Sequence, residues 1–119
     1  MEVFRNFRFH SARHLPNLQD DHICKKIHGH TFNLTVHVTG DINPQTGFII
    51  DFFDIDTIVK SNILETIDHE LLNDISDLQN PTSENLCKWI WNILIDHIDG
   101  LSKIVLSEDH GTGIIYSGE

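Results

Sequence analysis

The stretch that decides the fold is His28-Gly-His-Thr-Phe-Asn-Leu-Thr-Val-His-Val-Thr39. Four of its residues are apolar at every second position: Phe32, Leu34, Val36 and Val38. This alternation predicts a strand with one buried face, because successive strand side chains point to opposite faces. His28 and His30 also stand two positions apart, so the same rule places both imidazoles on one face.

Two convergent imidazoles form part of a His₃ zinc site of the catalytic kind, in which the fourth position stays open. Cys24 lies four residues before His28, and a thiolate can serve as a metal ligand, a nucleophile or a base. A His-x-His pair by itself is also found as two ordinary polar strand residues. Other features of the sequence are needed to distinguish a metal site from ordinary polar residues.

The other elements follow from periodicity and capping residues. Alternation around Phe7 and Phe9 predicts a first strand that continues to His14, and Asp54 and Thr82 are predicted helix caps. Two helices are expected over residues 55–66 and 83–98, and two further strands over 103–108 and 113–117. The order strand, strand, helix, helix, strand, strand indicates an α+β fold in one domain, 1–119. A four-stranded sheet of this size leaves two open edges, which oligomerisation can cover.

Composition narrows the class of partner. The chain has 119 residues and a formal net charge of −10, which argues against nucleic acid and anionic membranes as partners. A small anionic ligand stays open, because five of the eight basic residues lie near the candidate site: Arg5, Arg8, Arg13, Lys25 and Lys26. These cations can equally form a solvated face. No stretch has the length of a membrane span, and two cysteines without a disulfide pattern favour a reduced, cytoplasmic setting.

Several ordered motifs resemble the 6-pyruvoyl-tetrahydropterin synthase / 6-carboxy-5,6,7,8-tetrahydropterin synthase family. The matching stretches are Phe7-x-Phe9 with Ser11-Ala12, Cys24-x₃-His28-Gly-His30, Gly47 to Phe52, Asp68-His69-x-x-Leu-Asn73, Asn80 to Asn85, Glu108, and Tyr116 to Glu119. The short Cys-x₃-His-Gly-His spacing and the Asn-Pro-Thr-Ser-Glu stretch are similar to the bacterial 6-carboxy branch, which serves queuosine synthesis. The resemblance therefore implies a tunnelling (T-fold) protein, ββααββ, that assembles as a homohexameric barrel with active sites between subunits.

The resemblance also implies a reaction and a set of roles. A zinc-dependent lyase of this branch converts 7,8-dihydroneopterin triphosphate to 6-carboxy-5,6,7,8-tetrahydropterin, acetaldehyde and triphosphate. Cys24 resembles the general base, and the pair Asp68-His69 resembles a proton relay, although the same pair fits a helix C-terminus without chemistry. Glu108 matches the carboxylate that anchors the pterin, with a surface strand glutamate as its ordinary alternative. Thr82 and Ser83 match a pterin-contacting stretch that also suits a helix cap.

One departure concerns the third zinc ligand. The family has Ala-Ala-His-Arg where this chain has Ser-Ala-Arg13-His14, and a one-residue shift in a strand turns a side chain to the other face. A β-bulge near residue 12 would restore the aim of His14, and we expect His14 to complete the zinc site with His28 and His30. The other readings are that His10 or His22 completes the site, or that Arg13 fills a weak or inactive one. A pyruvoyl-type synthase and a non-catalytic pterin-binding paralogue are the competing functions.

Overall fold

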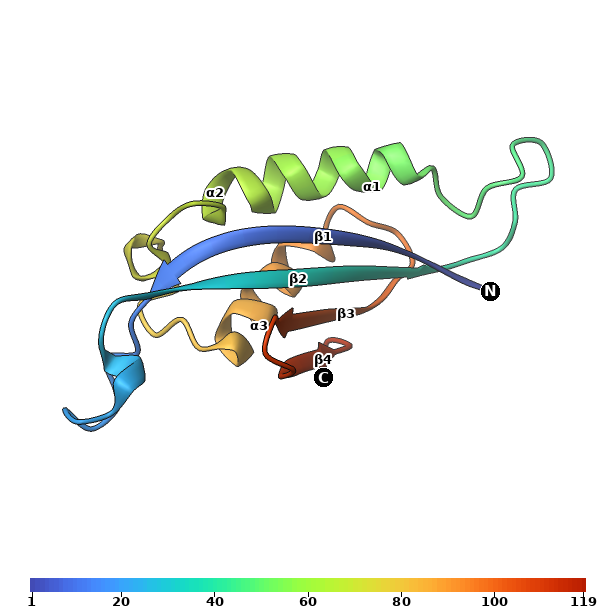
Figure 1. Ribbon diagram of the computed structural model, residues 1–119. Coiled ribbons are helices and arrows are strands. Elements are labelled where there is room, and N and C mark those ends of the chain that lie inside the picture. Colours follow the sequence, from blue (N-terminus) through green and yellow to red (C-terminus); the bar gives the residue numbers. More distant parts are fainter.

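The computed structural model describes residues 1–119 and contains one antiparallel sheet in the order β1-β2-β3-β4 (Figure 1). Its strands are β1 (Glu2–Arg13), β2 (His28–Thr39), β3 (Leu101–Glu108) and β4 (Gly113–Tyr116). The long strand predicted from the alternating apolar residues therefore forms β2, and each strand pairs with the next one along the chain. The outer strands β1 and β4 form the two edges of this sheet.

The first helical stretch is continuous from residue 52 to residue 67. It consists of α1 (Phe52–Val59), a π-helical turn (Lys60–Leu64) and α2 (Glu65–Ile67). The predicted cap at Asp54 is wrong, because the Asp51 carboxylate accepts the hydrogen bond from the backbone N–H of Phe53 at 2.9 Å. Asp54 instead lies in the first turn, where its negative charge faces the positive end of the helix.

The second helix, α3 (Ser83–Leu94), begins at its predicted cap. The Thr82 hydroxyl accepts a hydrogen bond from the backbone N–H of Asn85 at 3.1 Å. The helix ends four residues before the predicted 98, because the N–H groups of His97 and Ile98 both turn onto the carbonyl of Leu94. Gly100, with φ of 81°, then lets the chain reverse into β3.

The helices cover one face of the sheet and bury a single hydrophobic cluster against it. Along β1 and β2 the buried positions alternate, so Phe7, Phe9, Phe32 and Leu34 pack inward against helical residues such as Ile55 and Ile90. Figure 1 shows α1 running along β1, while α3 packs against β3 and β4. None of the helices combines the length and the apolar character that crossing a bilayer requires.

Strand register positions the site at one end of this inner face. Arg13 pairs with His28, and Ser11 pairs with His30. Phe32, one step further along β2, lies between Phe9 of β1 and Glu108 of β3. Paired residues of an antiparallel sheet share a face, so Arg13, the two imidazoles and Glu108 all project toward the helices.

Candidate functional site

Two imidazoles lie together at the start of β2. The rings of His28 and His30 are 4.7 Å apart at 79°, and the Nε2 atom of each is buried without a hydrogen-bond partner. The Nδ1–H of His28 donates to the carbonyl of Lys26 at 2.6 Å, which leaves the lone pair on Nε2. A buried polar nitrogen without a partner is costly. Two such lone pairs side by side fit a divalent metal ion, which neutral imidazole binds well.

Cys24 opens onto the same imidazoles. A cavity of about 470 Å³ is lined by Cys24, Lys26, His28, His30 and His110, with Ile23 and Ile27 at its side. The backbone N–H of Cys24 donates to Nδ1 of His22 at 3.1 Å, which closes the short turn that precedes β2. Lys25 forms an ion pair with Asp20, so Lys26 is the lysine that reaches the cavity. The cavity thus combines a thiol, an ammonium group and three imidazoles.

Arg13 occupies the inner-face position opposite His28. Its side chain is 7% exposed and crosses the sheet above the ring of Phe32, with the guanidinium carbon 5.4 Å from the ring centroid. Nη2 donates to Oε1 of Glu108 at 2.5 Å, and Nη1 donates to Oγ of Ser83 at 3.1 Å and to the Pro81 carbonyl at 3.2 Å. This cation is therefore tied to the end of β3 and to the start of α3.

Glu108 is the centre of this polar cluster. Its Oε1 accepts from Arg13 and, at 2.8 Å, from the Ser83 hydroxyl. Its Oε2 accepts from Thr112 at 3.3 Å and lies 2.9 Å from Nε2 of His110. Burial alone would raise the pKa of Glu108, but the Ser83 hydrogen bond and the charge of Arg13 outweigh it and lower the pKa. Glu108 is therefore a carboxylate whose two oxygens both accept hydrogen bonds.

The histidines expected to complete the metal site do not join His28 and His30. Pairing between β1 and β2 runs unbroken from Glu2/Thr39 to Arg13/His28, so the predicted β-bulge near residue 12 is absent. His14 follows the end of β1, and both its backbone N–H and its carbonyl bond to the side chain of Asn73. His10 bonds to Thr31 through Nδ1 at 2.9 Å, and His22 bonds to the backbone of Cys24.

His110 is the residue that sequence reasoning missed. Its ring centroid lies 5.7 Å from that of His30, and one donor atom each of His30, Glu108 and His110 lies within 4.8 Å of the other two. Burial lowers the pKa of His30, and the nearby charge of Arg13 lowers it further. A neutral His30 keeps its lone pair at neutral pH, as a metal ligand requires. The only signal in the sequence is the Glu108-x-His110 spacing.

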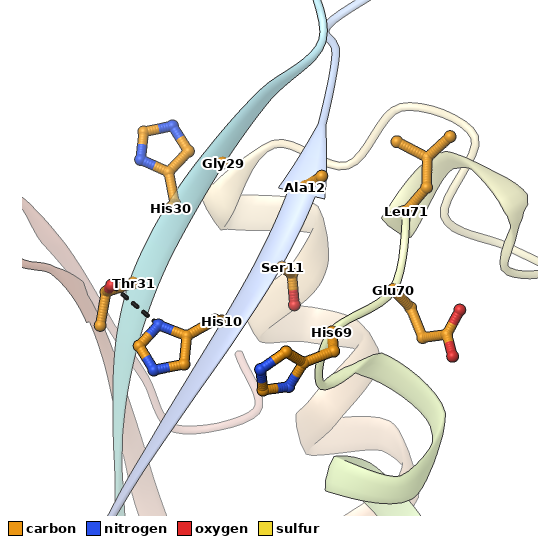
Figure 2. Close-up of a pocket in the computed structure, with 9 residues that line it drawn as sticks. All are labelled: His10, Ser11, Ala12, Gly29, His30, Thr31, His69, Glu70 and Leu71. Atoms are coloured by element: carbon orange, nitrogen blue, oxygen red, sulfur yellow. Dashed lines mark hydrogen bonds between the residues drawn. The ribbon is translucent and has the colours of Figure 1, made fainter.

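His69 lines a second cavity of about 500 Å³ beside β1, and Asp68 precedes it in the chain (Figure 2). Oδ1 of Asp68 lies 2.9 Å from Nδ1 of His69 and also accepts the backbone N–H of His10 at 3.0 Å. His69 has φ of 62° and donates its own N–H to the carbonyl of His10. Figure 2 shows its ring beside that of His10, with centroids 5.7 Å apart, and His30 also lines this cavity.

The other two predicted site residues have different settings. Ser83 belongs to the Arg13–Glu108 cluster through two hydrogen bonds. Thr82 caps α3 with its hydroxyl. Cys24 and His69 line two different cavities. A single chain therefore does not bring the expected base and relay into one cavity.

Known proteins resemble this chain over most of its length. It is 31% identical over 111 residues to the 6-carboxy-5,6,7,8-tetrahydropterin synthase of Synechocystis sp., covering 89% of this chain and 84% of that protein. It is 34% identical over 93 residues to the dihydroneopterin monophosphate aldolase of Pyrococcus furiosus, covering 76% of this chain and 77% of that protein. The solved structure of Caenorhabditis elegans 6-pyruvoyl tetrahydropterin synthase matches all of this chain and 96% of its own with a TM-score of 0.90 at 23% identity.

The structural match confirms the predicted T-fold, in which a four-stranded antiparallel sheet carries its helices on one face. The family described as 6-pyruvoyl tetrahydropterin synthase matches residues 2–119. With that match over nearly the whole chain, the protein belongs to the 6-pyruvoyl tetrahydropterin synthase family.

Proposed function

We propose that this protein is a zinc-dependent lyase that converts 7,8-dihydroneopterin triphosphate to 6-carboxy-5,6,7,8-tetrahydropterin, acetaldehyde and triphosphate. Relatives named 6-carboxy-5,6,7,8-tetrahydropterin synthase support this activity. The observation that carries the proposal is the shared cavity of Cys24, His28 and His30, where a thiol faces two buried imidazoles with free Nε2 atoms. This arrangement places a potential base next to a potential Lewis-acid site.

His28 and His30 would hold the zinc ion through Nε2. The bound ion supplies Lewis acidity toward the side-chain oxygens of the substrate. Cys24 would take a proton from the substrate side chain, and it must be deprotonated to do so. Lys26 lines the same cavity and adds a positive charge to its wall.

Asp68 and His69 would return the proton. The Asp68 carboxylate orients the His69 ring through its 2.9 Å contact to Nδ1, which leaves Nε2 to exchange a proton. Because no cavity of one chain holds both Cys24 and His69, we propose that the relay serves the Cys24 cavity of a neighbouring subunit in a homohexamer. The open edges of the four-stranded sheet support such an assembly.

Glu108, with Ser83 and Thr82 nearby, would anchor the pterin through its amino and ring N–H groups. Arg13 already bonds to this carboxylate with the same kind of planar N–H edge, so the pterin must displace Arg13 to reach Glu108. This contact favours a second candidate function, a pterin-binding protein without turnover. The family alternative of a pyruvoyl-type synthase has its support in relatives named 6-pyruvoyl tetrahydrobiopterin synthase.

Incubation of the zinc-loaded protein with 7,8-dihydroneopterin triphosphate, followed by mass spectrometry of the products, tests the proposal. We expect the 6-carboxy product with acetaldehyde and triphosphate, and no turnover in Cys24→Ala. A pyruvoyl pterin or an aldol-cleavage product would assign a different reaction of the family. Substrate that binds and is recovered unchanged would favour the non-catalytic paralogue.

A further inference from the structure

We propose that His110 is the third metal ligand of this chain and that it replaces the strand histidine lost at position 13. The inference rests on the zinc dependence proposed above and names residues that the family pattern does not. The site would then consist of His28 and His30 from β2 and His110 from the turn after β3. Three neutral imidazoles with an open fourth position form the ligand set of a catalytic zinc site.

Position 13 cannot supply a ligand in this chain. A guanidinium has only donors and stays protonated, so Arg13 offers no lone pair to a metal ion. Its Nη1 and Nη2 groups donate to Glu108, Ser83 and the Pro81 carbonyl, which fixes the side chain on the inner face opposite His28. The unbroken register of β1 then leaves no inward position for the neighbouring His14.

His110 reaches the same end of the inner face from the other side of the sheet. It follows Glu108 by two residues, in the turn that Gly111 closes with φ of 94°. The turn directs the imidazole back toward β2, where its ring centroid lies 5.7 Å from that of His30. His110 also lines the cavity that contains His28 and Cys24. No other histidine outside β2 lines that cavity.

The hydrogen bonds behind these rings support a metal-binding role. Metal-ligating histidines usually donate their second ring N–H to a carbonyl or a carboxylate. His28 does so to the Lys26 carbonyl, and Nε2 of His110 lies 2.9 Å from Oε2 of Glu108, within ion-pair distance. The bond of His28 leaves the lone pair on its Nε2, and the contact of His110 with Glu108 leaves its Nδ1 free to face the ion. Glu108 is therefore a positioning residue for His110, held in place by its bonds to Arg13 and Ser83.

The charges are also consistent with a bound dication. Arg13 and Glu108 neutralise each other within one ion pair. The negative charge of Glu108 therefore offsets the repulsion between the Arg13 cation and the metal ion. The unpartnered Nε2 atoms of His28 and His30 supply a second observation, independent of His110, that points to a ligand at this place.

Zinc affinity of the purified full-length protein tests the inference without relying on turnover. The protein is stripped with a chelator and titrated with Zn²⁺ against a chromophoric competitor, and Co²⁺ absorption then reports the coordination number. Loss of an outer hydrogen-bond partner costs 10–100-fold in metal affinity, so we expect His110→Ala to raise the zinc dissociation constant by at least about 100-fold. His97→Ala, which removes an exposed histidine elsewhere, is the matched control and should leave it unchanged.

A rescue variant sharpens the result. Arg13→His restores an imidazole opposite His28, so the double variant Arg13→His/His110→Ala should regain most of the zinc affinity that His110→Ala loses. Circular dichroism checks the fold of each variant, and His110→Asn provides a second substitution at the exposed turn. If the native protein binds zinc and His110→Ala binds it equally well, the inference is overturned while the proposed activity stands. Protein that binds no zinc at all would overturn both.

Discussion

The guanidinium of Arg13 and the carboxylate of Glu108 form a buried ion pair across the sheet, with Nη2 and Oε1 2.5 Å apart and side chains only 7% and 9% exposed. Removal of one partner from a buried pair leaves the other charge uncompensated. We expect Arg13→Ala to lower the free energy of unfolding by roughly 3 kcal/mol, measured by chemical denaturation. Arg8→Ala breaks the exposed pair with Asp109 and should cost less than about 1 kcal/mol. Equal losses in the two variants would contradict this account.

Cys24→Ala separates the roles of base and ligand. If Cys24 is the base, the variant should bind zinc with the affinity of the native protein and lose turnover by at least about 100-fold, because general base catalysis contributes that much. Zinc content and product formation are measured on the same preparation. Loss of zinc from the variant would make Cys24 a ligand and remove it as the base.

Asp68→Asn tests the relay. The substitution keeps the shape of the side chain but removes the negative charge that faces Nδ1 of His69. We expect kcat to fall by about 100-fold and the pH profile of kcat to change, while zinc affinity is retained. Asp96→Asn alters an exposed carboxylate outside this cavity and should leave kcat, its pH profile and the zinc affinity unchanged. A pH profile identical to that of the native protein would mean that Asp68 only supports the backbone of His10.

The two cysteines should react very differently with alkylating reagents. Burial raises the pKa of the Cys87 thiol to about 12, and its side chain is fully buried in the core, so almost no thiolate forms near pH 8. Cys24 is partly exposed in its cavity. Iodoacetamide at pH 8 should therefore modify one thiol of the native protein, located at Cys24 by peptide mapping, and two thiols in denaturant. Native-state labelling of Cys87 would show that α3 opens readily.

His30 should make the metal-free protein sensitive to mild acid. Burial and the charge of Arg13 hold the pKa of His30 below its ordinary value of 6.5, so the unfolded chain binds a proton at this residue more readily than the folded chain. The free energy of unfolding should therefore decrease as the pH falls below about 6.5. Denaturation curves at pH 7.5 and 5.5 measure the effect, which should shrink in His30→Gln and persist in His97→Ala. A native protein whose stability is the same at both pH values would contradict it.

Local patterns predicted the elements of the fold and the common face of His28 and His30. The apolar alternation after His30 specifies β2, and the same period of two places His28, His30 and position 13 on one face. The cap at Asp51 was missed because Asp51 and Asp54 are both good capping residues. The choice between them depends on where the preceding loop ends. His14 was expected to be a ligand through a β-bulge near residue 12, but the pairing of β1 with β2 is unbroken up to Arg13 and His28.

The rest of the site depends on contacts between distant parts of the chain. His110 lies eighty positions after His30, and no local pattern links the two residues. Only the pairing of Phe32 with both Phe9 and Glu108 brings the end of β3 beside the start of β2. The bond from Arg13 to Glu108 likewise spans β1 and β3, so it becomes visible only when the register of all three strands is known.

The segment from Asp68 to Leu71 lies against the open edge of β1 only near the C-terminal end of that strand, where His10 and Ala12 bond to it. Before His10, β1 is an edge strand without a further strand beside it. The backbone N–H and C=O groups of Phe4 and Arg8 point to this edge, as those of His10 do. A strand from another protomer can thus add alongside residues 2–8 and must halt at His10. In the proposed homohexamer, the segment that stops this strand carries His69, so its position would set both the overlap of two protomers and the place of this imidazole.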